Sequence, residues 1–185
     1  MKQVSNILLI IVTLTTCLNM IYFPWELRFV NTKYNYLFVM VLAIILPISA
    51  FFWSTLRDTK SVKVIGVIIS VCLAIPCFLT FTFAKLDYAD ITTKGVDYSF
   101  EEINRLKVGD ESYVLYRTNG GATTSFGLVL RMEKEIALGI NAVNVIYSKY
   151  KASESSLELT NENQIKMQIQ PYDKHGKVEV VVLSI

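Results

Sequence analysis

The first half of the chain contains three stretches without a charged side chain, residues 4–23, 36–53 and 64–84. Crossing ~30 Å of hydrocarbon takes about 20 predominantly apolar residues, because a helix rises about 1.5 Å per residue. None of the three has the charged face, at a 3.6-residue period, that a helix of a soluble domain shows. The pattern predicts a three-helix transmembrane domain over residues 1–84.

The second half changes to an alternation of hydrophobic and polar positions, after a polar connector at residues 85–98. Such alternation is typical of strands with one buried face. The capping-box pattern of Ser99 and Glu102 predicts one short helix, about residues 99–108, which Gly109 ends. Hairpin and turn signals lie at residues 119–121 and 173–176. The predicted strands are 111–118, 123–134, 142–150, 156–159, 164–170 and 177–184.

These elements predict a membrane α-helical protein with a small α+β, mostly antiparallel β, extramembrane domain over residues 85–185. We expect its sheet to curl into a small barrel or sandwich. The composition agrees, because 52% of the 185 residues are hydrophobic and only 18% are charged. Residues 85–185 contain twelve Lys and Arg against fourteen Asp and Glu. This balance argues against nucleic acid as a partner, since binding phosphates needs a basic surface.

The basic residues near the apolar stretches predict the orientation of the chain. Arg57, Lys60 and Lys63 lie in the short second connection, on the same side as Lys2, whereas the first connection carries only Arg28 and Lys33. Basic loops stay in the cytoplasm. We therefore expect a cytoplasmic (inner) membrane protein with a cytoplasmic N-terminus and a periplasmic or extracellular C-terminal domain. The alternative, a cleaved N-terminal signal, leaves that domain on the same side.

No Asp, Glu, Lys, Arg or His lies within the predicted spans, which argues against a proton relay or a transporter's coupling site. Small residues recur every four positions in the third span, at Gly66, Ser70 and Ala74, where another helix can approach closely. Polar residues form a thin stripe on the first span, at Asn6, Thr13 and Cys17. We interpret both sets as helix-packing positions within the bundle; the alternative is a docking face for another membrane protein.

The sequence predicts no catalytic, cofactor or metal site. All three cysteines lie in the spans, and the single histidine, His175, lies in a predicted turn. A histidine-based metal site or nucleophile pair therefore has no second member. The run of residues 120–125 lacks the lysine of a phosphate-binding loop. Three pairs of carboxylates are close in the sequence. We interpret Glu101/Glu102 as the start of a helix, Asp110/Glu111 as part of a turn, and Glu133/Glu135 as part of a solvated strand face.

The leading hypothesis for function is a non-catalytic, membrane-anchored binding protein, either an accessory subunit or an immunity-type protein. Its partners would be membrane lipid and another protein, in the membrane or outside the cytoplasm. Seven tyrosines occur in residues 85–185, and tyrosine is enriched at protein interfaces. The candidate contact patch is Tyr147, Lys149, Tyr150 and Lys151. Two alternatives stay open: a membrane-anchored carboxylate enzyme, and an envelope sensor in which Pro47 and Pro76 couple the domain to the helices.

Overall fold

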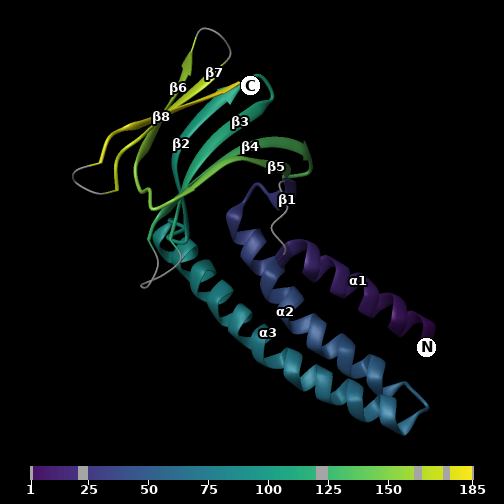
Figure 1. Ribbon diagram of the computed structural model, residues 1–185. Helices are drawn as coiled ribbons and strands as arrows, with labels where there is room; N and C mark the ends of the chain where they lie inside the picture. The colour runs from purple at the N-terminus through teal and green to yellow at the C-terminus, as the bar shows by residue number, and fades with distance from the viewer. Residues whose placement is uncertain (1, 21–24, 120–124, 161–163, 173–175, 185) are drawn as a thin grey trace. The chain divides into compact units, whose positions relative to one another are not determined.

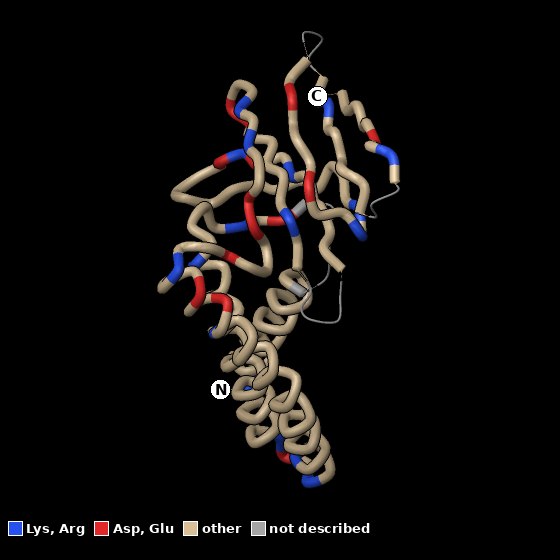
Figure 2. Tube along the Cα trace, turned by 90° about the vertical axis from the view of Figure 1, so that its left-hand side faces the viewer, with Lys and Arg blue, Asp and Glu red and all other residues tan. Residues whose placement is uncertain are grey.

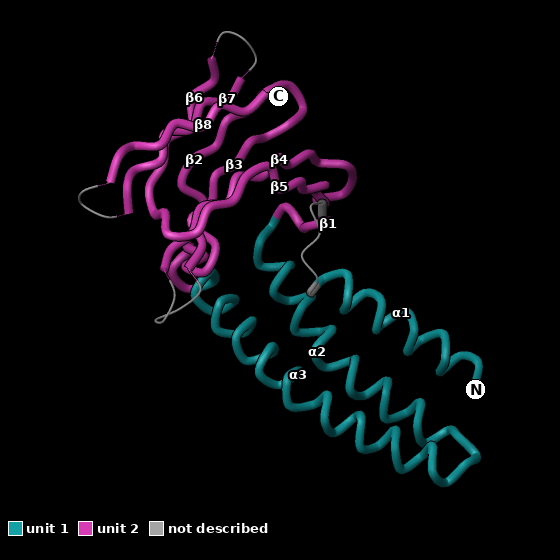
Figure 3. Tube along the Cα trace, in the orientation of Figure 1, with its two compact units in different colours: residues 1–23, 31–92 teal, residues 24–30, 93–185 magenta. Residues whose placement is uncertain are grey.

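The computed structural model describes residues 2–20, 25–119, 125–160, 164–172 and 176–184 (Figure 1). The chain forms two compact units (Figure 3). One comprises residues 1–23 and 31–92, and the other comprises residues 24–30 and 93–185. The predicted turns at residues 120–121 and 173–175, including His175, lie outside the described residues.

The first unit is helical and consists of α1 (Lys2–Met20), α2 (Thr32–Thr55) and α3 (Lys60–Lys94). All three helices are long and apolar enough to cross a membrane. The side chain of Asn31 caps α2 by accepting a hydrogen bond from the backbone N–H of Lys33 at 3.1 Å. Helix α3 has 35 residues and continues ten residues beyond the predicted end of its span. At about 1.5 Å per residue it is longer than the hydrocarbon layer requires.

Large apolar side chains cover the outside of these helices. Val4, Ile75 and Phe78 are each about two-thirds exposed, at 68%, 66% and 68%. Figure 2 shows that charged residues gather near the α2–α3 connection and are absent along the middle of the helices. Soluble proteins rarely expose apolar surfaces this extensive, whereas lipid covers them without cost. The helical unit is therefore compatible with a membrane protein.

The second unit consists of two antiparallel sheets. Sheet A has five strands in the order β1-β5-β4-β3-β2, and sheet B has three in the order β6-β7-β8. The strands are β1 (Trp25–Phe29), β2 (Phe100–Val108), β3 (Glu111–Thr118), β4 (Gly127–Ala137), β5 (Ile140–Tyr150), β6 (Ser155–Thr160), β7 (Gln164–Ile169) and β8 (Glu179–Ser184). The prediction of a mostly antiparallel β region is confirmed.

The core of this unit lies between the two sheets. Leu115, Leu128 and Leu130 of sheet A are fully buried, and they belong to the same hydrophobic cluster as Ile165 and Met167 of sheet B. On β7 the buried residues alternate with partly exposed ones, as the sequence pattern predicts. The hydrophobic effect therefore joins the two sheets through one face of each.

The predicted helix at residues 99–108 is wrong, because these residues form strand β2. The β2–β3 pairing contains a bulge between Glu102 and Asn104. A bulge adds one residue to a strand, so the core-facing side chains of Ile103 and Leu106 are three positions apart instead of two. This spacing resembles one face of a helix. The Asp97 carboxylate accepts hydrogen bonds from the N–H groups of Ser99 and Phe100, so Ser99 is not a helix cap.

Strand β1 is the element that the sequence interpretation missed. It lies in the connection between α1 and α2 and pairs with β5, from Trp25 opposite Asn144 to Phe29 opposite Ile140. The predicted domain division at residues 84 and 85 therefore leaves out residues 24–30, which belong to the second unit. If α2 and α3 both cross a bilayer, the chain returns to the side from which it started. Strand β1 precedes α2, and strands β2 to β5 follow α3. These strands can form one sheet only if they lie on the same side of the bilayer.

Candidate functional site

Sheet A carries charged side chains on the face opposite the core. Adjacent side chains of a strand point to opposite faces. Because Leu115 and Leu130 lie in the core, their neighbours Tyr116 and Arg131 lie on the other face. The strand pairings add residues from β1, β2 and β5. We call this surface the charged face and define it as Glu26, Arg28, Glu102, Arg105, Tyr116, Arg131, Glu133 and Asn141.

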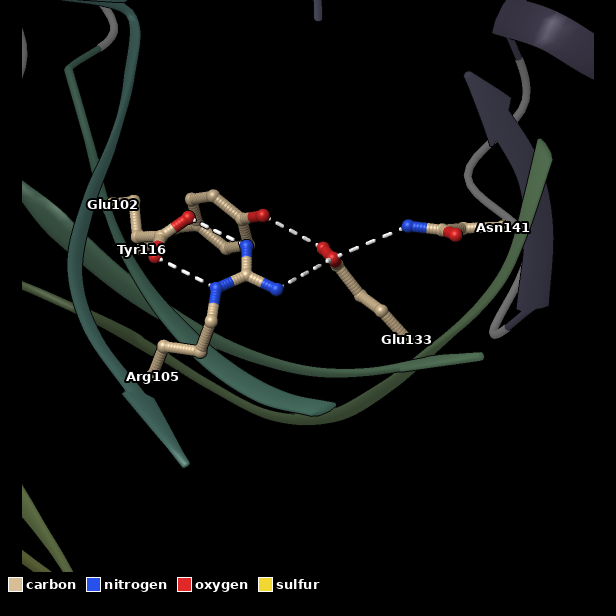
Figure 4. A network of polar contacts seen from close by, with 5 residues as sticks. All are labelled: Glu102, Arg105, Tyr116, Glu133 and Asn141. Carbon is tan, nitrogen blue, oxygen red and sulfur yellow. Dashed lines mark hydrogen bonds and ion pairs between the residues drawn. The ribbon is translucent and has the colours of Figure 1, made fainter. Parts of the chain in front are cut away.

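Glu133 lies at the centre of the charged face, and only 9% of its surface is exposed. Tyr116 Oη donates a 2.7 Å hydrogen bond to Glu133 Oε1, and Asn141 Nδ2 donates a 3.5 Å hydrogen bond to Glu133 Oε2 (Figure 4). Arg105 Nη1 lies 3.8 Å from the same Oε2 atom. A buried carboxylate needs such partners, because an unpaired charge is costly to remove from water. The interpretation of Glu133 as part of a solvated strand face is therefore wrong.

Arg105 links two carboxylates on the charged face. Its Nε and Nη2 atoms donate to the two oxygens of Glu102 at 2.8 and 2.6 Å, and its Nη1 atom lies near Glu133. The hydrogen bond with Glu102 raises the pKa of Arg105 above its ordinary value, and the charge of Glu133 adds to the effect. Glu102 and Glu133 are thus joined through one guanidinium. Both are occupied by side chains of the protein, which suits a binding or structural role.

Arg131 is the charged residue with the fewest partners on this face. Its guanidinium carbon lies 4.1 Å from the centre of the Phe100 ring and 5.5 Å from that of Tyr116. Its Nε atom is buried without a hydrogen-bond partner, and no carboxylate in the described part of the chain forms an ion pair with it. Burial lowers the pKa of Arg131, and repulsion from Arg28 adds to this shift. An anionic group beside Arg131 would accept a hydrogen bond from Nε and would offset the cost of burying the positive charge.

Removal of the Tyr116 hydroxyl tests the network around Glu133. We expect Tyr116→Phe to lower the free energy of unfolding near pH 7 by about 1 kcal/mol, because Glu133 loses a buried donor. Burial, followed by the charge of Glu133, raises the pKa of Tyr116 well above 10.0. Above pH about 10 the unfolded chain releases this proton while the folded protein keeps it, so stability falls as pH rises. Denaturant unfolding between pH 7 and 11 should show a shallower alkaline fall for the variant.

Two other tyrosines, Tyr113 and Tyr147, also contribute to the alkaline loss of stability. Burial also raises the pKa of Tyr113 and of Tyr147, so the alkaline fall should decrease in Tyr116→Phe without disappearing. An unchanged alkaline slope in the variant would contradict the proposed burial of the Tyr116 phenol.

The helix-packing residues divide into two groups. Gly66 and Ser70 are buried, and a Cβ atom at Gly66 would lie 2.3 Å from the Cβ atom of Ser54 in α2. Asn6 Oδ1 accepts a 2.9 Å hydrogen bond from Trp53 Nε1 of α2, and a second hydrogen bond from Arg57. The other predicted positions lie on exposed surfaces of their helices and are Thr13, Cys17 and Ala74.

The predicted contact patch also divides. Tyr147 Oη donates a 3.4 Å hydrogen bond to Glu179 of β8, and Lys149 forms an ion pair with the same carboxylate. These two residues therefore connect β5 with sheet B. Tyr150 is 62% exposed, and its Oη atom accepts a hydrogen bond from Ser125 N, while Lys151 is exposed. A partner contact at Tyr150 and Lys151 stays a prediction.

Comparison with known proteins does not identify a relative. No protein-family model matches the chain, and no curated protein or solved structure is significantly similar to it. The functional argument therefore depends on the geometry of the charged face. The sequence contains one signal that points to this face: Arg131 and Glu133 alternate with Leu130 and Met132, which are core positions.

Proposed function

We propose that this chain is a non-catalytic binding protein, anchored by three transmembrane helices, that presents its β-rich unit at the outer face of the cytoplasmic membrane. Its partner would be another protein, held through an anionic group at the charged face. The apolar exterior of the helices supports the anchor. The concentration of Arg57, Lys60 and Lys63 near the α2–α3 connection supports a cytoplasmic location for that connection.

The observation that carries the binding proposal is the state of Arg131. A guanidinium is always charged in proteins and offers five donors. Here the side chain is half-buried, lies over the Phe100 ring and has its Nε donor buried without a hydrogen-bond partner. The Glu133 carboxylate already accepts hydrogen bonds from Tyr116 and Asn141 and forms an ion pair with Arg105. A carboxylate or phosphate group of a partner would complete the hydrogen bonding of Arg131, and Phe100 would hold the guanidinium plane in place.

Replacement of Arg131 tests this proposal. We expect Arg131→Gln to reduce recovery of a stoichiometric partner, after purification of the full chain from its native membrane in mild detergent, by about 10- to 100-fold. This range corresponds to the loss of about 1.5–3 kcal/mol for a hydrogen bond to a charged group. The measurement is quantitative mass spectrometry of the co-purified proteins. Recovery of the chain alone from wild-type membranes would contradict the proposal.

Arg117 provides a matched control on the neighbouring strand. Its guanidinium also lies near an aromatic ring, 5.4 Å from the centre of Phe126, but it forms a 2.5 Å ion pair with Glu101. Because Arg117 already has a carboxylate partner, Arg117→Gln should leave partner recovery unchanged. Equal losses in both variants would indicate a general effect on the sheet and not a site at Arg131.

The sensor hypothesis is favoured by one separate observation. Strand β1 is hydrogen-bonded into sheet A, and only Val30 and Asn31 separate it from the first residue of α2. A short connection transmits displacement more directly than a long flexible linker. In this second candidate function, binding at the charged face would move β1 and thereby α2, whose interior contains Pro47.

A further inference from the structure

The hairpin that connects β4 to β5 ends in an unusual turn. Leu138 and Gly139 occupy the turn, and both have positive φ, 49° and 76°. Two-residue turns of this kind favour Asn-Gly or Asp-Gly, because a side chain with a large apolar body fits a positive φ poorly. Leu138 is also 100% exposed. A leucine here is therefore unfavourable for the backbone and unfavourable in water, which indicates that something apolar covers it.

Three other exposed apolar residues lie on the same hairpin or on β1 and the residue that follows it. Ile136 precedes the turn on the same hairpin and is 55% exposed. The N–H group of Val30 donates a 2.8 Å hydrogen bond to the carbonyl of Gly139, which places Val30 against the turn with 53% of its surface exposed. Leu27 on β1 is 61% exposed. We call these four residues the apolar tip: Leu27, Val30, Ile136 and Leu138.

The chain ties the apolar tip to the start of α2. Val30 is two residues from Thr32, where α2 begins, and Tyr36 begins the uncharged stretch of that helix. Two extended residues span at most about 7 Å, and four helical residues rise about 6 Å. The headgroup layer is about 5–8 Å thick on each side. These lengths keep Val30, and the turn bonded to it, at or close to the lipid headgroups when α2 crosses the bilayer.

Both backbone groups of Gly139 in this turn are hydrogen-bonded within the protein. The Gly139 carbonyl accepts the hydrogen bond from Val30, and the Gly139 N–H group donates to Glu135 Oε1 at 3.2 Å. An unsatisfied backbone group is costly in an apolar layer, so a turn with both groups bonded enters one more readily. Bonding of these groups lowers the cost of placing the turn among lipids.

We propose that the apolar tip inserts into the interfacial layer of the lipid bilayer, as a second contact between the β-rich unit and the membrane. The occupant is lipid and not protein, because the covalent path through Val30 keeps the tip within reach of the bilayer. The inference rests on the proposed insertion of α2. It adds that the β-rich unit touches the membrane through sheet A.

Fluorescence quenching of the full chain tests this inference. Cys17, Cys72 and Cys77 are first replaced by alanine, and a single cysteine at Leu138→Cys is labelled with bimane. The chain is then reconstituted in phosphatidylcholine–phosphatidylglycerol vesicles. We expect nitroxide lipids with a shallow quencher to quench this label several-fold more than a label at Val180→Cys, which is 53% exposed on sheet B. Aqueous iodide should show the opposite order.

Two further labels make the outcomes distinguishable. Ile136→Cys avoids the positive-φ position, so the measurement does not depend on an altered turn. Val41→Cys, on the exposed surface of α2, reports the insertion of that helix. Lipid quenching at Val41 but not at Leu138 or Ile136 would overturn the membrane contact of the apolar tip alone. If the labels at Leu138 and Ile136 were in addition protected from iodide, the occupant of the tip would be a protein. Absence of lipid quenching at Val41 would overturn the proposed membrane anchor itself.

Discussion

Leu130→Ala is expected to lower the free energy of unfolding of the β-rich unit by about 2–5 kcal/mol. Leu130 is completely buried between Leu115 and Leu128 of sheet A and the side chains of sheet B. Truncation removes apolar contact and leaves a cavity that the paired strands cannot close, because β4 is hydrogen-bonded on both sides. Small domains are marginally stable, so this loss is a large part of the total free energy of unfolding. Denaturant unfolding of the full chain in detergent, followed by intrinsic fluorescence, measures it.

The matched control for Leu130 is Leu159 on β6. Leu159 is 48% exposed, so Leu159→Ala removes a leucine from the same unit with little loss of buried contact. We expect its effect on the unfolding free energy to stay within about 0.5 kcal/mol. Similar losses at both positions would contradict a core located between the two sheets.

Gly66→Ala is expected to destabilise the helical unit, although alanine has the higher helix propensity by about 1 kcal/mol. The new Cβ atom would lie 2.3 Å from Ser54 Cβ and 3.3 Å from Ser54 Cα. Contacts this short force α2 and α3 apart, and overpacking of this kind typically costs about 1–3 kcal/mol. Circular dichroism during SDS titration of the reconstituted chain measures the change in unfolding free energy.

A second substitution, at Ser54, tests whether this contact is the cause of the lost stability. Ser54→Gly removes the atom that the new methyl group would meet, so the double variant Gly66→Ala/Ser54→Gly should recover most of the lost stability. Ala74→Val, at the exposed end of the same small-residue series, should have little effect. A stable Gly66→Ala variant, or a double variant no better than the single one, would show that the two helices do not pack at Gly66.

Local hydrophobic period predicted most elements of this protein. The three apolar helices and the strands from β3 to β8 follow patterns that operate within ten to twenty neighbouring residues, where uncharged runs favour helices and alternation favours strands. Strand β1 was missed, and strand β2 was predicted as a helix because its bulge changes the local spacing at Ile103 and Leu106. Only the pairing of Glu102 and Asn104 with β3 distinguishes this spacing from that of a helix.

The sequence by itself determined the helical and β-rich halves and the buried alternation of β7. Each depends on side chains near one another along the chain. Tertiary structure alone decided that β1 joins sheet A, that Glu102 and Glu133 meet at Arg105, and that Val30 lies against Gly139. These contacts join residues that are distant in sequence, and their energies depend on which strands pair. No local pattern carries that information, so the charged face and the apolar tip became visible only in the folded chain.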